Sequence, residues 1–333
     1  MSERLPTIDD VCTAARRLAG LAVETPLVAS PTLDAAVGAS VLLKLESLQR
    51  GGAFKFRGAC NRIAAVDPAV FPGGVVACSS GNHAQGVAAA ARLRGLASRI
   101  VMPRDAPQAK IAGTRALGGE VVLYDRERED REAMARELAS RYRADFVHPF
   151  DDALVIAGQG TVGLEIVRQA ATLGIEPDAV LVPCSGGGLV SGISLAITAA
   201  HPRCEIMTVE PDGFDDFARS LASGTREAND RTTGSIADAL MAERPGRLTF
   251  EIARSRLARG LVVTDDELAA AVGFAFRELK LVLEPGGAAA LAALLSGRLE
   301  EVAGRTIVAV LSGGNIDHEL LCRLLRAPPR GGA

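Results

Sequence analysis

Short apolar runs alternate with segments of helical period along nearly the whole chain, and this alternation constrains the fold more than any other feature. In 127–143, for example, Ala133, Met134, Leu138 and Tyr142 recur near helical spacing among charged residues. Strands that alternate with helices predict parallel sheets joined by helical crossovers. The predicted strands are 40–46, 74–80, 98–103, 120–124, 179–185, 205–210 and 306–312.

Helices are predicted between these strands. An opening helix follows Thr7, whose side chain is suited to cap the first turn. The segment 211–247 is irregular and rich in Pro, Gly and Asp, so we expect loops there. The other predicted helices are 55–66, 82–94, 108–117, 127–143, 159–173, 188–200, 265–280, 286–296 and 317–326.

The composition suits such a fold. Hydrophobic residues make up 48% of the chain and aromatic residues 4%, with no Trp, so aliphatic side chains must fill the core. Helices packed on a parallel sheet have this kind of core. The 333 residues suffice for two lobes, because single hydrophobic cores stop growing near about 250–300 residues.

Charge and cysteine spacing argue against several classes of protein. A net charge of −3 gives no attraction to nucleic acid or to an anionic membrane. No run approaches the roughly 20 apolar residues of a membrane span, and the N-terminus lacks an apolar segment, so a cytoplasmic protein is expected. The six cysteines are scattered without zinc-site spacing, which predicts reduced thiols and neither disulfides nor zinc.

Three glycines, 186–188, follow one predicted strand and lead directly into a predicted helix. The backbone N–H groups of a turn without side chains can close on an anion, and the helix dipole adds partial positive charge. The pattern is neither GxGxxG nor GxxxxGK[ST], so a small phosphorylated cofactor is favoured over a dinucleotide or a nucleoside triphosphate. A permissive turn without a ligand is the alternative.

The stretch SSGNHAQG places Ser79, Ser80, Asn82, His83 and Gln85 where a predicted strand runs into a predicted helix. Several donors around one helix N-terminus suit a carboxylate. The alternative is that one of the serines only caps the helix and that His83 is solvated.

Ser312 and Lys55 stand at two further positions of interest. Ser312 begins SGGN at the end of the last predicted strand, where its hydroxyl could meet a ring nitrogen or simply begin a tight turn. Lys55 lies between two phenylalanines in GGAFKFRGA. Most lysines are solvated surface groups, and Lys55 taken alone would be one of them.

In this order and at these separations, FKFRGA, SSGNHAQG, SGGGL and SGGN resemble the pyridoxal-phosphate enzymes of the tryptophan-synthase-β-like fold (fold type II). The likeness is to the branch of threonine and serine dehydratases and serine racemases, and it includes HPFDDALVIAGQGTVGLEI. It implies an α/β protein with two lobes of open, twisted, mostly parallel sheets flanked by helices. It also implies a large domain of residues 1–50 and 148–333, which binds pyridoxal phosphate, and a small mobile domain of residues 51–147, which binds the substrate.

The resemblance assigns a role to each motif. Lys55 would form the imine with pyridoxal phosphate, the glycine turn would hold the phosphate, and Ser312 would face the pyridine nitrogen. Phe54 would pack on the ring, and Asn82 would reach its 3′-oxygen. The implied cofactor-binding residues are Phe54, Lys55, Asn82, Gly186, Gly187, Gly188, Leu189 and Ser312. The implied substrate-binding residues are Ser79, Ser80, Asn82, His83, Gln85 and Arg131.

The surroundings of Lys55 bear on this role. A helix start and neighbouring apolar rings both disfavour the ammonium form, which leaves a neutral amine for imine formation. One departure from the branch is GGAFK, where the branch usually has Thr-Gly-Ser-Phe-Lys. Gly51 and Ala53 remove two hydroxyls, so the orientation of the substrate and of Lys55 is left open.

The implied reaction is an elimination. Lys55 would take the α-proton, the cofactor would store the charge, and the β-hydroxyl would leave. The resulting aminoacrylate would tautomerise and hydrolyse to a 2-oxo acid and ammonia. A hydroxyl at Ser312 would keep the pyridine nitrogen largely unprotonated and favour prompt elimination. Ser80 matches the serine that faces the lysine across the substrate in serine racemases, so it is a second catalytic candidate and racemisation stays open.

Two further roles follow from the resemblance. Arg131 is similar to the arginine that binds a second substrate carboxylate in racemase-like members, although it could be a solvated charge on a surface helix. The loop VEPDGFDDFARS looks like the family's divalent-cation loop. Glu210, the carbonyl of Phe214 and Asp216 would bind Mg²⁺, Ca²⁺ or Mn²⁺, with a solvated acidic turn as the alternative.

The sequence therefore predicts a cytoplasmic dehydratase (ammonia-lyase) of L-threonine or L-serine, with a homodimer expected as in much of the family. A 3-hydroxyaspartate dehydratase and a serine racemase are the alternatives within it. A non-catalytic amino-acid sensor would have no use for Lys55, and SSGNHAQG and HPFDD speak against a β-replacement synthase such as cysteine synthase. The chain ends soon after SGGN, so we expect no C-terminal regulatory domain.

Overall fold

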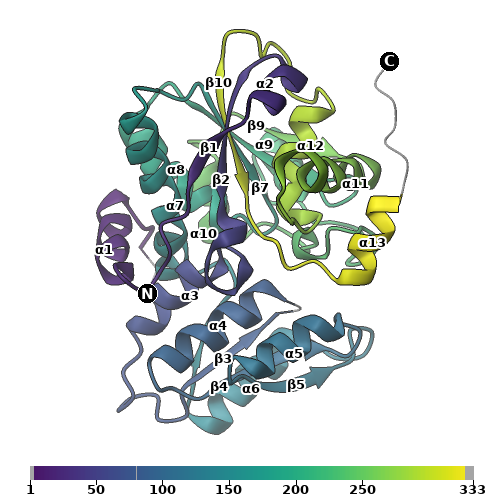
Figure 1. Ribbon diagram of the computed structural model, residues 1–333. Coiled ribbons are helices and arrows are strands. Elements are labelled where there is room, and N and C mark those ends of the chain that lie inside the picture. The colour runs from purple at the N-terminus through teal and green to yellow at the C-terminus, as the bar shows by residue number, and fades with distance from the viewer. Residues whose placement is uncertain (1–3, 80, 327–333) are drawn as a thin grey trace.

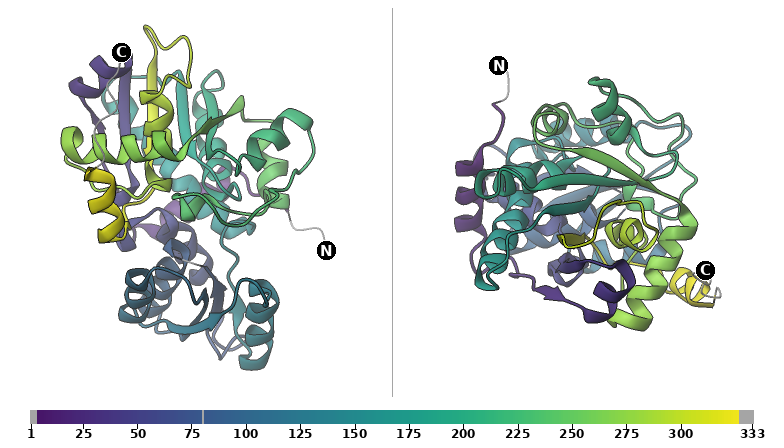
Figure 2. Two further views of the ribbon diagram at one scale, coloured as in Figure 1. Left: turned by 90° about the vertical axis from the view of Figure 1, so that its right-hand side faces the viewer. Right: turned by 90° about the horizontal axis from the view of Figure 1, so that it is seen from above.

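The structure is a computed structural model that describes residues 4–79 and 81–326. Figure 1 shows two lobes, with a six-stranded sheet in the upper lobe and a four-stranded sheet in the lower lobe. Figure 2 shows the two lobes from the side in its left view, and in its right view, from above, the large lobe lies over the small one. The predicted α/β architecture with mostly parallel sheets is confirmed. The domain limits at residues 51 and 147 remain a prediction.

The large sheet has the strand order β1-β2-β10-β7-β8-β9. β1 pairs antiparallel with β2, and every other neighbouring pair in this sheet is parallel. Its strands are β1 Leu27–Ala29, β2 Ser40–Leu45, β7 Ala179–Pro183, β8 Glu205–Pro211, β9 Arg259–Val263 and β10 Thr306–Leu311.

Helices cover both faces of the large sheet. Alternate residues of each strand face opposite sides, so Val180 and Val308 pack with α7 and α8 while their neighbours Leu181 and Ile307 pack with α11 and α12. These helices are α7 Ala153–Thr172, α8 Gly188–Ala200, α11 Asp265–Phe274 and α12 Ala289–Leu295. A π-helix, Ala275–Leu279, extends α11, and the 3₁₀ helix Gly286–Ala288 precedes α12.

The small sheet has the order β5-β4-β3-β6 and is parallel throughout. Ala77 and Ile100 pack on one face with α3 and α4, while Val76 and Val101 pack on the other face with α6. Its strands are β3 Val75–Cys78, β4 Ser98–Pro103, β5 Glu120–Tyr124 and β6 Asp145–Phe146. Its helices are α3 Lys55–Ala64, α4 Asn82–Leu93, α5 Gln108–Ala116 and α6 Arg131–Tyr142.

Several helix starts follow their capping residues. α1, Ile8–Leu18, begins after Thr7, as predicted, and Thr7 forms a capping box with Asp10. α6 begins at 131 and not at 127, because the Asp130 carboxylate accepts N–H groups of its first turn. α7 begins at 153 and not at 159, because Asp152 caps it in the same way.

The prediction of loops throughout 211–247 is wrong in its first part. α9, Asp216–Ser223, forms there, with Phe217 and Ser220 buried. Turn-forming residues before it hid its apolar face from sequence reasoning. The other elements without a sequence prediction are short: β1, β6, β9, α2 Pro31–Val37, α10 Arg247–Ala253 and the 3₁₀ helices Glu46–Leu48, Arg50–Gly52 and Asp238–Leu240.

The last helix, α13 His318–Arg326, lies beside α11 at the edge of the large lobe (Figure 1). Within residues 4–79 and 81–326, no helix combines the length and the apolar character needed to cross a membrane.

Candidate active site

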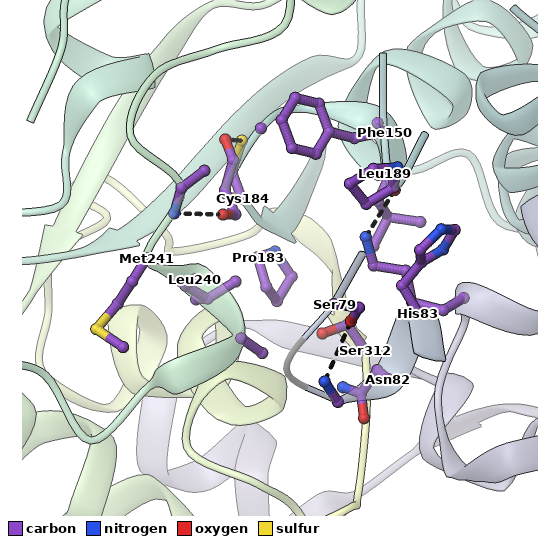
Figure 3. Close-up of a pocket in the computed structure, with 18 of the residues that line it drawn as sticks. Ser79, Asn82, His83, Phe150, Pro183, Cys184, Leu189, Leu240, Met241 and Ser312 are labelled. Carbon is purple, nitrogen blue, oxygen red and sulfur yellow. Dashed lines mark hydrogen bonds between the residues drawn. The ribbon is translucent and has the colours of Figure 1, made fainter. Parts of the chain in front are cut away.

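The carboxyl ends of three parallel strands open on a cavity between the two lobes. β3 of the small sheet ends at Cys78, and β7 and β10 of the large sheet end at Pro183 and Leu311. In open α/β proteins, this edge gathers the loops and helix N-termini that bind ligands. Figure 3 shows the cavity with residues from both lobes. The sequence-predicted residues that line it are Phe54, Lys55, Ser79, Asn82, His83, Arg131, Gly186, Gly187, Gly188, Leu189 and Ser312.

Lys55 is the first residue of α3 and reaches into this cavity. The N–H of Phe54 donates to the carbonyl oxygen of Ser312 at 3.1 Å, which ties the start of α3 to the end of β10. Lys55 Nζ donates to the carbonyl oxygen of Pro149 at 2.9 Å. Burial lowers the pKa of Lys55 from its usual 10.5 to about 8, because a poorly solvated site disfavours the ammonium. Neutral amine is therefore available near physiological pH.

The glycine turn between β7 and α8 leaves no room for side chains. A Cβ at Gly186 would collide with the ring of Phe150, and one at Gly187 with the ring of Phe217. Gly187 also has φ +91°, which a residue with a side chain rarely adopts. The Thr249 hydroxyl donates to the Gly186 carbonyl at 2.6 Å and holds the turn in place. α8 begins directly after it, and the N–H groups of its first turn have no intrahelical acceptor, so the turn suits a phosphate.

The amide of Asn82, at the start of α4, is bonded at both ends. Its Nδ2 donates to Glu284, and its Oδ1 accepts from Asn315 Nδ2 at 2.9 Å. Glu284 also lies 3.5 Å from Lys110 Nζ, which binds Asp238 at 2.6 Å. Because Lys110 belongs to the small lobe and the two carboxylates to the large lobe, these ion pairs cross the cavity.

Ser79 and His83 line the cavity near Asn82. Ser79 Oγ accepts the N–H of Gly81 at 3.1 Å. His83 Nε2 lies 3.2 Å from the carbonyl oxygen of Val147, while its Nδ1 is buried without a hydrogen-bond partner among the described residues. Burial lowers the pKa of His83 to about 3, so the ring is neutral at physiological pH and donates from Nε2. His83 is therefore a buried cavity residue and not a solvated one.

The remaining predicted substrate residues differ in position. Arg131 is the first residue of α6, after its cap Asp130, and lines the cavity. Gln85 is buried on α4 next to Gly113 of α5 and is not among the described residues that line the cavity. Ser80 lies outside the described residues.

Comparison with known proteins assigns the chain to a family. The sequence profile of the family described as pyridoxal-phosphate dependent enzyme matches residues 18–313. The chain belongs to this family. Its predicted membership of the fold type II pyridoxal-phosphate enzymes is thereby confirmed.

Relatives of this pyridoxal-phosphate-dependent enzyme cover nearly all of its chain. It is 43% identical to L-threo-3-hydroxyaspartate ammonia-lyase from Pseudomonas sp over 97% of this chain and 99% of the relative. It is 39% identical to serine racemase from Schizosaccharomyces pombe over 96% of this chain and 98% of the relative. The crystal structure of a threonine deaminase from T.th. is similar with a TM-score of 0.87 and 43% identity, covering 94% of this chain and 99% of that chain.

The cavity of this pyridoxal-phosphate-dependent enzyme fits the cofactor of its family. The side-chain-free turn 186–188 and the N–H groups of the first turn of α8 provide a cradle that suits a phosphate, and Lys55 lines the same cavity. Ser312 stands on a third side of it, 6% exposed. The aldehyde, the phosphate and the ring nitrogen of the cofactor are matched in chemistry by the Lys55 amine, the glycine turn and the Ser312 hydroxyl.

The predicted cation residues lie apart from this cavity, at the junction of β8 and α9. The Glu210 carboxylate accepts the N–H groups of Phe217 and Ala218 at 2.9 and 2.8 Å. Asp216 Oδ1 accepts from Asn229 Nδ2 at 2.6 Å, while Asp216 Oδ2 is buried without a hydrogen-bond partner among the described residues. Burial raises the pKa values of both carboxyls, that of Asp216 to about 7. The acidic pair is thus buried and not a solvated turn. Within the described residues, no group of three or more His, Cys, Asp or Glu side chains is arranged to hold a metal ion.

Sequence reasoning missed several residues of the cavity. Glu284 and Lys110 are the chief examples, and both are nearly fully buried. The signal for Glu284 was an acid within the apolar run LVLEPGGAAAL, next to a Pro-Gly-Gly turn. Lys110 carried no such signal, because QAKIAG reads as an ordinary helix with one exposed cation. The missed lining residues also include Phe150, Cys184, Ser185 and Asp238.

Proposed function

We propose that the protein is an ammonia-lyase that dehydrates and deaminates a β-hydroxy-α-amino acid, with L-threonine or L-serine as first candidate. The observation that carries this proposal is the convergence of Lys55, the glycine turn 186–188, Ser312 and Asn82 on one cavity. The names of the relatives support the same class of reaction, since a hydroxyaspartate ammonia-lyase and a threonine deaminase are both above 40% identical.

Three groups would hold pyridoxal phosphate: Lys55 at the aldehyde, the turn 186–188 at the phosphate and the Ser312 hydroxyl at the pyridine nitrogen, with Phe54 beside the ring. When bound, the cofactor supplies an electron sink for the charge left on the substrate α-carbon. Lys55, with its pKa near 8, would take the α-proton once the substrate amine has displaced it. The β-hydroxyl would then leave as water, and the released enamine would tautomerise and be hydrolysed by water to the 2-oxo acid and ammonia.

The N-terminus of α4 is the proposed binding site for the substrate carboxylate. Ser79 and Asn82 line the cavity there, and the N–H groups of the first helical turn favour an anion. His83 is neutral and cannot add a positive charge, so we propose that it only shapes the site. Gln85 would contribute only after a movement of α4 or α5 that brings it to the cavity.

A 3-hydroxyaspartate substrate is the second candidate, because of Arg131. Arg131 is only partly exposed and lines the cavity on the small-lobe side, where a guanidinium could bind a second carboxylate in a bidentate manner. Serine racemisation is a third candidate that depends on Ser80, a residue outside the described ones.

A panel of substrates tests the proposal. The protein supplied with pyridoxal phosphate is assayed with L-threonine, L-serine, D-serine and the diastereomers of 3-hydroxyaspartate, and scored for ammonia, 2-oxo acid and inverted amino acid. Ammonia with an equal amount of 2-oxo acid supports the lyase, and inverted product without ammonia would favour a racemase. Turnover of none of these, with tight amino-acid binding, would favour a sensor. A new thiol or thioether product, in a parallel assay of L-serine with added sulfide or a thiol, would favour a β-replacement synthase.

Arg131→Ala tests the second carboxylate. We expect kcat/KM for 3-hydroxyaspartate to fall by about 10- to 100-fold, in line with the loss of about 1.5–3 kcal/mol for a charged hydrogen bond, with little change for L-serine. Arg128→Ala is the matched control, because the Arg128 side chain is 83% exposed three positions away. Equal losses on both substrates would reject this role for Arg131.

We also propose that a divalent cation, Mg²⁺ first and Ca²⁺ or Mn²⁺ as alternatives, binds at Glu210, the Phe214 carbonyl and Asp216. Two buried carboxyls with raised pKa values and one unsatisfied oxygen among the described residues support this, since a hard cation would stabilise both anions.

The small lobe of residues 51–147 would move against the rest, and the protein would act as a homodimer. Light scattering of the holoenzyme measures the oligomer, and a monomer at micromolar concentration would reject the dimer.

A further inference from the structure

The turn between β6 and α7, residues 147–151, contacts three parts of the cavity. The Val147 carbonyl meets His83, and the Pro149 carbonyl accepts from Lys55 Nζ. The Phe150 ring packs against the glycine turn at Gly186, and Figure 3 shows Phe150 among the residues that line the cavity. We call residues 147–151 the 147–151 turn. Its shape decides where the carbonyl partner of Lys55 lies.

His148 holds the 147–151 turn together from inside. Its Nδ1 accepts the N–H groups of Phe150 at 3.3 Å and of Asp151 at 2.8 Å. Pro149, which lies between His148 and Phe150, has no N–H to donate. The imidazole of His148 therefore closes the turn by accepting the next two N–H groups, in place of a backbone carbonyl. A nitrogen that accepts two N–H groups carries no proton, so Nε2 of His148 carries the hydrogen of the neutral ring.

The rest of the His148 ring is held by packing, and one acid lies near it. Its ring centroid lies 4.7 Å from that of Phe150 and 6.1 Å from that of Phe146, both edge to face. His148 Nε2 lies 3.7 Å from a carboxylate oxygen of Glu132, the second residue of α6. Glu132 directly follows Arg131, so the ring links the 147–151 turn to the helix start that carries the proposed substrate arginine.

We infer that His148 is a positioning residue, which fixes the Pro149 carbonyl on Lys55 through its Nδ1 acceptor and joins this carbonyl to the first turn of α6 through Nε2. This inference rests on the proposed role of Lys55. A carbonyl that accepts from the ammonium stabilises the charged form of the lysine. Losing the turn would therefore remove an acceptor from Lys55 and release Phe150 from the glycine cradle at the same time.

Three substitutions separate the two nitrogens of His148. His148→Asn keeps an acceptor close to the place of Nδ1, since an asparagine oxygen can accept the N–H two residues on. His148→Gln places its amide nearer to Nε2 and Glu132 and loses the short-range acceptor. His148→Leu loses both functions with a side chain of moderate size.

Trapping of Lys55 by pyridoxal phosphate and borohydride gives a readout besides turnover. The initial rate of Lys55 modification, measured by peptide mass over a pH series, follows the fraction of neutral lysine and so has a midpoint set by the pKa of the lysine. In His148→Leu and His148→Gln we expect this midpoint to move to lower pH and kcat/KM for ammonia release to fall by about 100-fold, the cost of a ~1 Å misplacement of a reacting group. His148→Asn should keep the unmodified midpoint and most of the activity. His83, whose charge would also act on Lys55, stays neutral over this range.

The tautomer of His148 in the unmodified chain tests whether Nδ1 is the acceptor in the 147–151 turn. This measurement does not depend on whether the variants fold. Nitrogen–proton correlation spectra of the four histidines, assigned by the signal absent from His148→Asn, should show His148 protonated at Nε2 alone. Protonation at Nδ1 would overturn the inference. So would a midpoint and kcat/KM that are alike in all three variants and the unmodified chain, or a loss that His148→Gln rescues and His148→Asn does not.

These outcomes are distinct from a failure of the proposed function. If borohydride traps no cofactor on Lys55 in the unmodified chain, the proposed function fails, whatever the tautomer of His148. Suppose that borohydride traps the cofactor on Lys55 in the unmodified chain and traps none in Lys55→Ala. If His148→Leu then has the same trapping profile as the unmodified chain, only the positioning role of His148 fails.

Discussion

The side-chain nitrogen of Lys55 lies 2.9 Å from the carbonyl oxygen of Pro149, although 94 residues separate them in the chain. Lys55 begins α3, and Pro149 lies in the turn that leads from the small sheet into α7. The two meet because α3 packs closely along α7, where Gly58 and Gly158 allow the helix backbones to approach. A Cβ at either glycine would collide with the other helix, so this approach also sets the position of the lysine.

The rate at which Lys55 bonds pyridoxal phosphate should rise with pH through about 8. Burial lowers the pKa of Lys55 to about 8, and the neutral amine is the nucleophile, so the reactive fraction grows as the pH passes this value. At pH 7, roughly a tenth of the lysine would be neutral, by the ordinary titration relation. Stopped-flow absorbance of the apoenzyme mixed with the cofactor measures the rate. A midpoint near the ordinary lysine value of 10.5 would show that Lys55 is solvated.

Gly187→Ala should abolish tight cofactor binding. The new Cβ would meet the Phe217 ring at a position with φ +91°, and only a shift of the glycine turn could relieve the collision. Gly118→Ala is the matched control, because Gly118 has φ +92° with no described atom within 4 Å of the added Cβ. Both variants carry backbone strain of about 1–2 kcal/mol. If titration of the apoenzymes shows equal cofactor affinity, the turn is not the phosphate cradle.

Arg57→Leu should lower the free energy of unfolding by about 3–5 kcal/mol, as expected when one partner leaves a buried ion pair. The Arg57 guanidinium, 1% exposed, binds both oxygens of Glu46 at 2.8 Å and the two oxygens of Glu165 at 2.6 and 2.8 Å. Without it, the Glu46 side chain keeps only the Thr25 hydroxyl as a hydrogen-bond donor among the described residues. Urea denaturation of the apoenzyme gives the value.

The control for Arg57 is Arg254→Leu, which breaks an exposed pair with Glu251. Exposed pairs contribute about 0–1 kcal/mol, so this variant should unfold near the midpoint of the unmodified chain. Losses of similar size in Arg57→Leu and Arg254→Leu would contradict a buried network around α3.

Removal of divalent cations should lower the melting temperature of the protein, and Asp216→Asn should remove this sensitivity. A cation that binds only the folded state stabilises it in proportion to its occupancy, and Asp216 would supply a charged ligand. Asp215→Asn is the matched control, because the neighbouring Asp215 is not one of the proposed cation ligands and pairs with Arg219. The melting temperature is read with chelator and with added Mg²⁺, Ca²⁺ or Mn²⁺. A chelator effect that persists in Asp216→Asn would place the cation elsewhere.

Local sequence patterns were sufficient for much of the fold. The predicted strands at 98–103 and 120–124 have the same limits in the structure, because apolar residues in a continuous run are buried on both faces of a parallel sheet. Boundaries at helix starts were less secure, as α7 shows: its first turn is governed by the Asp152 side chain and not by apolar period. β6 has only two residues and exists through its pairing with β3, so no periodicity could indicate it.

The residues of the candidate site also fall into those that the sequence could indicate and those that it could not. SGGGL and SSGNHAQG are contiguous stretches whose chemistry depends on a strand end and a helix start, so the sequence could indicate them. Lys110, Glu284 and Asp238 are far apart in the chain and acquire meaning only where they pair across the cavity. The position of Gln85 away from the described lining residues likewise depends on how α4 packs on α5.

The sequence by itself determined that this chain forms parallel sheets and which motifs end their strands, because both depend on residues within a few positions of one another. The sequence indicated that the ammonium form of Lys55 is disfavoured, but tertiary structure alone decided that its partner is the Pro149 carbonyl and that burial lowers its pKa as far as about 8. It also decided that His148 closes the turn carrying that carbonyl. Burial, and contacts between residues far apart in the chain, result from packing of the whole fold. Patterns among neighbouring residues therefore do not predict them.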